Sequence, residues 1–146
     1  MENETIVQTL NELLAHESQS MLPRLGESTV FVSWASADEQ QIVGRMIEEA
    51  RENGARLVDA IRELGGEPLP VLADIQSTAL HFLDLSHVLP AILNDCKRLL
   101  NLYESAAGQL GSSPLASSVI TEIIDRHRKH VDQLAGLTER AASPTN

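Results

Sequence analysis

Apolar residues recur every three or four positions through four long segments of this chain, and this spacing constrains the fold more than any other feature. The segments cover residues 2–26, 36–64, 73–109 and 113–140. Apart from the short run 29–32, no segment alternates with the period of two that a half-buried β-strand needs. The sequence therefore predicts an all-α fold made of four amphipathic helices, which is a four-helix bundle.

Capping residues mark the ends of the second helix and the start of the fourth. Ser36 and Glu39 form a capping box, because each side chain can bond the backbone amide of the other. Gly65-Gly66 is a signal for the C-terminal end of the second helix. The dipeptide Ser113-Pro114 suits the N-cap and the first position of the fourth helix.

The connections between the helices decide the topology. The linker 27–35 and the turn near Gly111 are short enough to make antiparallel hairpins of the first two and of the last two helices. The connection after Gly65 leaves two orders open. A short turn gives an up-down-up-down bundle, whereas an extended stretch over 69–78 lets the chain cross the bundle.

Two prolines leave the limits of individual helices open. Pro23 can kink or end the first helix, because proline has no N–H and its ring clashes with the preceding turn. Pro90 allows two alternatives for the third segment, either one kinked helix or two helices that meet there.

Length and composition fit one domain with an aliphatic core. The chain has 146 residues, of which 42% are hydrophobic and only 3% are aromatic. Leu, Ile, Val and Ala must therefore fill the interior. We expect one helical domain over residues 1–142 and a frayed tail over 143–146.

Charge and cysteine content exclude several classes of partner and site. Asp and Glu number 21 against 11 Lys and Arg, which gives a net charge of −10. Nucleic acids and anionic membrane surfaces are therefore not expected as partners, because both need clustered basic residues. Cys96 is the single cysteine, so no intrachain disulfide can form. With an acidic N-terminal stretch and no apolar run near ~20 residues, the expected location is the cytoplasm.

Ionisable residues lie within the apolar faces of the first and last helices. His127 and His130 continue the apolar spacing of the fourth segment, and Glu17 falls between Leu13 and Met21 in the first. A buried carboxylate is costly unless a partner, a metal or a wet cavity compensates it. Three interpretations follow: a metal site inside the bundle, a pairing of Glu17 with a histidine that binds nothing, or faces that turn toward water.

Further polar residues border the same faces on the two middle helices. Glu49 and Asn53 follow the edge of the second apolar face, and Asp95 flanks the third. Carboxylate and imidazole together suit zinc, iron or manganese. The candidate ligands of one divalent metal are therefore Glu17, Glu49, Asn53, Asp95, His127 and His130.

Three stretches resemble the ferritin-like superfamily, which includes bacterioferritin and rubrerythrin. Residues 13–17 are similar to its first helix, where a glutamate ligates iron. Residues 48–68, with their Leu-Gly-Gly ending, are similar to its second helix, and residues 89–130 are similar to its second hairpin. The resemblance implies a ferritin-like bundle in which one helix of each hairpin carries a Glu and the other a Glu-x-x-His.

The departures from that pattern weaken the implied di-iron site. Counted back from Leu-Gly-Gly, the family's Glu-x-x-His of the second helix falls on Ala50 and Asn53. On the fourth helix His127 stands where the family has a carboxylate. The carboxylates among the candidate ligands are too few to balance the charge of two irons. The whole set of candidate ligands is enough for one divalent ion. We therefore do not expect a di-iron ferroxidase, and whether the protein is an enzyme stays open.

The sequence supports two hypotheses of function. The first is a ferritin-like protein with an altered, mononuclear metal site, and the second is a structural or interaction bundle that has lost its metal. In both we expect a homo-oligomer, with a dimer as the first guess. Phe31 and Trp34 are an apolar pair that either packs under the end of the bundle or is buried at a dimer contact. No substrate class can be named.

Overall fold

A computed structural model describes residues 2–26, 37–69 and 85–142 of the chain. These residues form helices and connecting turns, without any strand. The helices are α1 (Glu2–Ser18), α2 (Met21–Gly26), α4 (Ala37–Glu63), α5 (Leu85–Ala107) and α6 (Pro114–Ala142). The predicted all-α fold is thus confirmed. Among the described residues, no helix has the length and apolar character that crossing a membrane requires.

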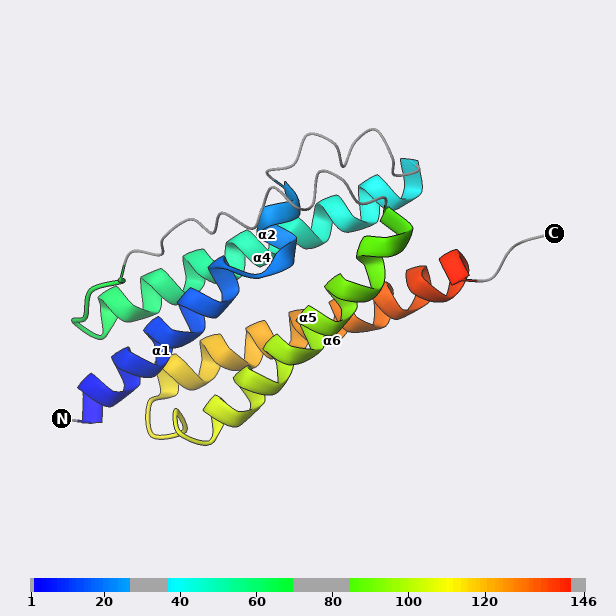
Figure 1. The fold of residues 1–146 in the computed structure, drawn as a ribbon. Helices are drawn as coiled ribbons and strands as arrows, with labels where there is room; N and C mark the ends of the chain where they lie inside the picture. The colour runs from blue at the N-terminus through cyan, green and yellow to red at the C-terminus, as the bar shows by residue number, and fades with distance from the viewer. Residues whose placement is uncertain (1, 27–36, 70–84, 143–146) are drawn as a thin grey trace.

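The four long helices pack side by side as a bundle (Figure 1). α1 runs antiparallel to α4, and α5 runs antiparallel to α6, so the two predicted hairpins are confirmed. However, α5 begins at the end of the bundle where α4 begins, not where α4 ends (Figure 1). α4 and α5 therefore run in the same direction, which excludes the up-down-up-down order; the chain between residues 69 and 85 lies outside the described residues.

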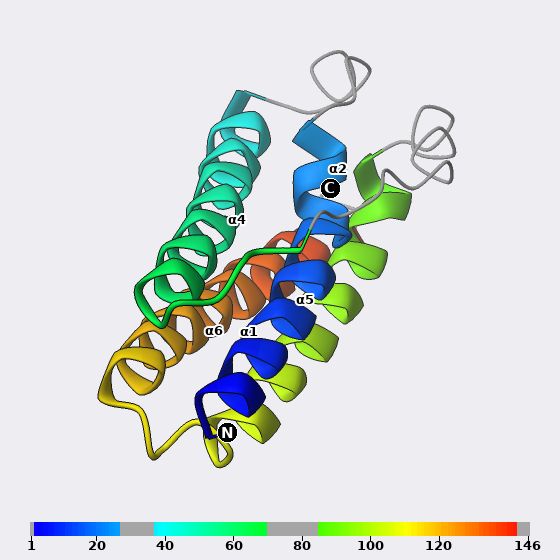
Figure 2. The same cartoon turned by 90° about the vertical axis from the view of Figure 1, so that its left-hand side faces the viewer.

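Each long helix contacts two others, so that the four enclose a common interior. α1 and α6 each contact both α4 and α5. Figure 2 shows α4 on one side of the bundle and α5 on the other, with α1 and α6 between them. Side chains from all four helices can therefore meet at the centre.

The interior consists of two apolar clusters at different levels along the bundle. One cluster includes Leu10, Leu57 and Ile120, and the other includes Met46, Ile92 and Leu134. On α1, α4 and α6, buried polar residues lie in sequence between the members of the two clusters. These residues are Glu17, Asn53, His127 and His130. A polar layer thus separates the two apolar clusters.

The first predicted helix is interrupted before Pro23, not at it. α1 ends at Ser18, a turn follows, and α2 begins at Met21. In an unbroken helix Pro23 would leave the carbonyl of Gln19 without a donor, and its ring would clash with that carbonyl. In the first turn of a new helix the missing N–H has no such cost.

Glycine and serine end and begin the helices as predicted. Gly65 has φ of +83°, and the amide of Gly66 donates to the carbonyl of Ile61 over 2.9 Å, which is a Schellman motif at the end of α4. Ser113 accepts the amide of Ala116 over 3.2 Å and caps α6. α5 continues through Pro90 as one helix, so of the two alternatives left open there, the one with two helices is excluded.

Other predicted features fall outside the described residues. They are the capping serine Ser36, the pair Phe31 and Trp34, the start of the third segment before Leu85 and the tail 143–146.

Replacing Gly65 tests the Schellman ending. We expect Gly65→Ala to lower the free energy of unfolding by about 1–2 kcal/mol, because a Cβ disfavours the left-handed backbone. Gly44→Ala in the same helix is the control, since an added Cβ there meets no atom within 4 Å. That variant should gain about 0.5–1 kcal/mol in urea unfolding. Equal effects of the two substitutions would contradict the assignment.

Candidate functional site

The polar layer brings together one buried side chain from each long helix. Glu17 comes from α1, Asn53 from α4, Tyr103 from α5 and His127 from α6. Each of these residues is at most 1% exposed. The layer is therefore closed to solvent, and its polar atoms depend on one another for hydrogen bonds.

One oxygen of Glu17 is the meeting point of the layer. The hydroxyl of Tyr103 donates to Glu17 Oε1 over 2.7 Å, and His127 Nε2 lies 2.8 Å from the same oxygen. The side-chain amide of Asn53 donates to it over 3.5 Å. The rings of Tyr103 and His127 stack with their centroids 5.4 Å apart. A single carboxylate oxygen thus links all four long helices.

Burial keeps Tyr103 in the form that donates. Desolvation, and then the nearby charge of Glu17, raise the pKa of the Tyr103 hydroxyl well above its usual value of 10.0. The hydroxyl therefore keeps its proton at physiological pH. Because it keeps this proton, the Tyr103 hydroxyl helps to compensate the cost of burying the Glu17 carboxylate.

A second pair lies beside the first and reaches toward the surface. His130 Nε2 is 3.1 Å from Glu49 Oε1, and the ring of His130 meets that of His127 edge-on at 5.7 Å. His130 is buried, whereas the side chain of Glu49 is 34% exposed. Desolvation lowers the pKa of His130 below 6.5, although its hydrogen bond with Glu49 acts in the opposite direction.

A guanidinium group approaches the layer from its edge. Arg126 donates to Asn53 Oδ1 over 3.1 Å and forms ion pairs with Glu52 at 3.3 Å and Glu122 at 3.5 Å. Both ends of the Asn53 amide are thus used within the protein. The neighbouring inward position on α4 is Ala50, which is buried and has no ligand atom.

Asp95 has a different role from the one predicted. Its Oδ2 accepts the backbone amide of Met21 over 2.9 Å and so caps the start of α2, while Oδ1 pairs with Arg98 at 3.0 Å. None of its recorded bonds is to the polar layer. Its neighbour Cys96 is buried, and burial raises the pKa of the thiol to about 12, so Cys96 is an inert core residue.

Comparison with solved structures finds a similar bundle. A ferritin-like, diiron-carboxylate protein from Bacillus anthracis str. Ames superposes with a TM-score of 0.73 at 16% sequence identity. The match covers 94% of this chain and 98% of the other. The fold is ferritin-like. No family model matches the sequence, and no curated protein matches it at significance.

Few carboxylates reach the polar layer of this ferritin-like bundle. Among the described residues, Glu17 is the carboxylate inside the layer, and Glu49 reaches it only from the edge. Within the described ranges, no three His, Cys, Asp or Glu side chains are grouped so that they could hold a metal ion. A di-iron cluster needs more carboxylates than this to balance its charge.

Three ligand-type atoms in the layer nevertheless lack a hydrogen-bond partner. They are Glu17 Oε2, His127 Nδ1 and His130 Nδ1, and all three are buried. Such atoms call for an explanation, which is either a bound water or ion or a cost in stability.

The structure therefore groups some of the predicted ligands and separates others. Glu17, Asn53 and His127 meet at one point, and His130 pairs with Glu49 beside them. The hydroxyl of Tyr103 was not predicted as part of the site, although a buried tyrosine usually has a hydrogen-bond partner. Arg126 was not predicted either, because that residue is outside the apolar face and reaches Asn53 only through its long side chain.

Removing the central carboxylate should strongly destabilise the bundle. Glu17→Ala leaves Tyr103 and His127 buried without their shared acceptor, so we expect a loss of about 3–5 kcal/mol in the free energy of unfolding. Glu48→Ala on the exposed face of α4 is the control and should change it by less than about 0.5 kcal/mol. A loss below about 1 kcal/mol for Glu17→Ala would contradict the network.

The lowered pKa of His130 makes a prediction about pH. The unfolded chain binds a proton at His130 near pH 6.5, whereas the folded protein binds it only at lower pH. Stability should therefore fall as the pH drops below ~6.5, until the folded pKa is passed. In urea unfolding between about pH 7.5 and pH 5, His130→Gln should flatten this dependence. The surface variant His16→Gln should keep it, and equal slopes in all three proteins would contradict the assignment.

Proposed function

We propose that this protein is a ferritin-like structural or interaction bundle in which hydrogen bonds between side chains have taken the place of a metal centre. One observation carries the proposal. Glu17 Oε1 is shared by Tyr103 and His127, so the groups at the centre of the bundle bond each other. These bonds link the four helices without an ion, although Glu17 Oε2 and the Nδ1 atoms of both histidines have no partner.

The second helix supports the same conclusion. The two positions that the ferritin-like resemblance assigns to metal ligands carry Ala50, which cannot ligate, and Asn53, which bonds Arg126. Since Arg126 occupies the amide oxygen of Asn53, this oxygen is not free to ligate a cation. Redox chemistry at a di-iron cluster is therefore not part of the proposed function.

A second candidate is a single divalent metal held by Glu17, His127 and His130. The observation that favours it is the set of three buried atoms without partners: Glu17 Oε2, His127 Nδ1 and His130 Nδ1. A carboxylate oxygen and imidazole nitrogens suit iron, zinc or manganese. Since these side chains are not already grouped as a metal site, binding would require them to rearrange.

Metal analysis distinguishes the two candidates. The untagged protein, produced with iron, zinc and manganese supplied, should contain less than about 0.1 metal ion per chain. Added metal should leave the melting temperature unchanged, because an ion that does not bind the native state cannot stabilise it. One ion per chain, lost in Glu17→Gln and His127→Gln but kept in the surface control His16→Gln, would establish the second candidate. Two irons per chain would contradict both.

Self-association and location remain predictions. The expected homodimer can be tested by sedimentation of the purified protein. The expected cytoplasmic location can be tested by fractionation of the cells that produce it.

A further inference from the structure

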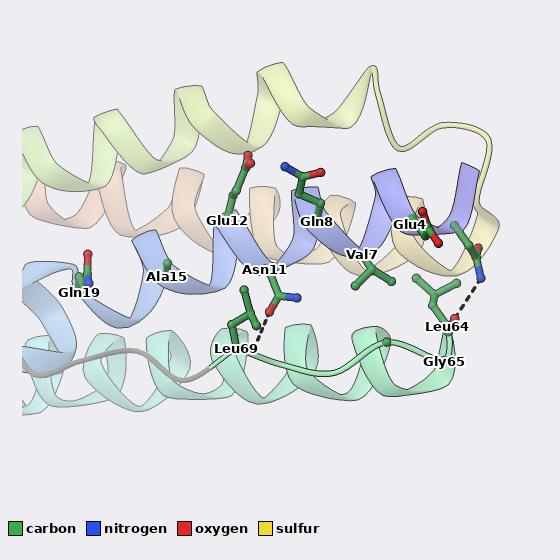
Figure 3. Close-up of a pocket in the computed structure, with 12 residues that line it drawn as sticks. Glu4, Val7, Gln8, Asn11, Glu12, Ala15, Gln19, Leu64, Gly65 and Leu69 are labelled. Carbon is green, nitrogen blue, oxygen red and sulfur yellow. Dashed lines mark hydrogen bonds between the residues drawn. The ribbon is translucent and has the colours of Figure 1, made fainter. Parts of the chain in front are cut away.

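A groove lies on the outer side of α1, away from the polar layer. It has a volume of about 710 Å³ and lies between α1 and residues 64–69, which follow the end of α4 (Figure 3). This volume is typical of sites for small molecules. Glu17 does not line the groove, because it is on the buried face of the same helix.

Two asparagines fix the far wall of the groove to α1. Asn3 donates to the carbonyl of Leu64 over 3.0 Å. Asn11, which is 8% exposed, donates to the carbonyl of Glu67 over 3.1 Å and accepts the amide of Leu69 over 2.8 Å. The segment that closes the groove is therefore attached to α1 at both ends, which keeps the groove open without a ligand.

Close packing supports the floor between these attachments. Val7 lies so near Gly66 that a Cβ on this glycine would collide with the valine methyl groups. The wall and the helix thus meet below the groove and cannot approach further. The groove is consequently a built feature of the α1–α4 hairpin.

The lining combines an apolar floor with acidic edges. Val7, Ala15, Leu64 and Leu69 supply apolar surface, and Leu69 is 62% exposed although it is a large hydrophobic residue. Among the residues that the structure describes, Glu4 and Glu12 are the charged residues of the lining, and none is Lys, Arg or His. In Figure 3 both side chains project from α1, and the carboxylate of Glu12 points away from Leu64 and Leu69.

We propose that this groove binds a small amphipathic cation, with an alkyl body on the apolar floor and an ammonium group beside one of the two carboxylates, which are about 12 Å apart along α1. Charge selects this occupant, because the described lining has two carboxylates and no basic residue, which favours a positive ligand. A second copy of the chain fits poorly, since each copy has a net charge of −10 and would bring more carboxylates to the acidic edge.

A matched pair of probes tests the proposal. Octyltrimethylammonium and octanoate have the same alkyl length and opposite charge, and both are used below the concentrations at which they form micelles. In methyl NMR spectra, the cation should shift the signals of Val7, Leu64 and Leu69, and its affinity should exceed that of octanoate by about tenfold or more at low salt. If neither probe shifts these methyls, or if both bind equally, the proposal is wrong.

Two double variants test whether the preference for the cation comes from the carboxylates of the groove or from the net charge of the protein. Glu4→Gln with Glu12→Gln should abolish the preference for the cation, because it removes both groove carboxylates. Glu48→Gln with Asp59→Asn, on the exposed face of α4, removes the same charge elsewhere and should keep the preference. Loss of the preference in both double variants would show that net charge alone attracts the cation and would overturn the site.

Discussion

A carboxylate in the interior of a bundle must be compensated, and in this protein the compensation of Glu17 links all four long helices. Tyr103 and His127 bond one oxygen of Glu17, and Asn53 approaches it from the remaining helix. Because each donor comes from a different helix, a rotation or shift of any one helix breaks a buried hydrogen bond. The polar layer therefore fixes how the helices are turned toward one another, which aliphatic packing alone specifies less strictly.

The layer also explains the division of the core. Two apolar clusters lie at different levels of the bundle, and Glu17, Asn53 and the two histidines lie between them. In ferritin-like di-iron proteins the metal ligands project into the bundle core. Here the same architecture encloses side chains that bond each other. The sole tyrosine of a chain with 3% aromatic residues donates the shortest hydrogen bond to the carboxylate, at 2.7 Å.

Local sequence signals predicted the helices because each signal acts over a few residues. The 3.6-residue period of apolar residues predicted the long helices and the inward orientation of Glu17, His127 and His130. Gly65 ends α4 as predicted. The order of the helices after Gly65 could not be predicted, because no local signal distinguishes a short turn from a connection that crosses the bundle.

Contacts between helices were harder to predict. Asp95 was a candidate ligand because it flanks the apolar face of the third segment. Successive residues of a helix point about 100° apart, so a residue beside an apolar face can turn away from the centre, and Asp95 in fact caps α2. The bonds made by Tyr103 and Arg126 depend on which helices are neighbours and on the reach of a long side chain. The spacing of apolar residues within one segment shows neither which helices are neighbours nor how far a side chain reaches.

The hydroxyl proton of Tyr103 offers the most direct test of a centre held by hydrogen bonds. Because this hydroxyl is buried and donates to Glu17, its proton should exchange slowly and appear as a separate downfield signal in proton NMR spectra, with a nuclear Overhauser effect to the ring of His127. Our account predicts that adding ferrous, zinc or manganous ions leaves this signal unchanged. Its loss or shift at one equivalent of metal would contradict the account.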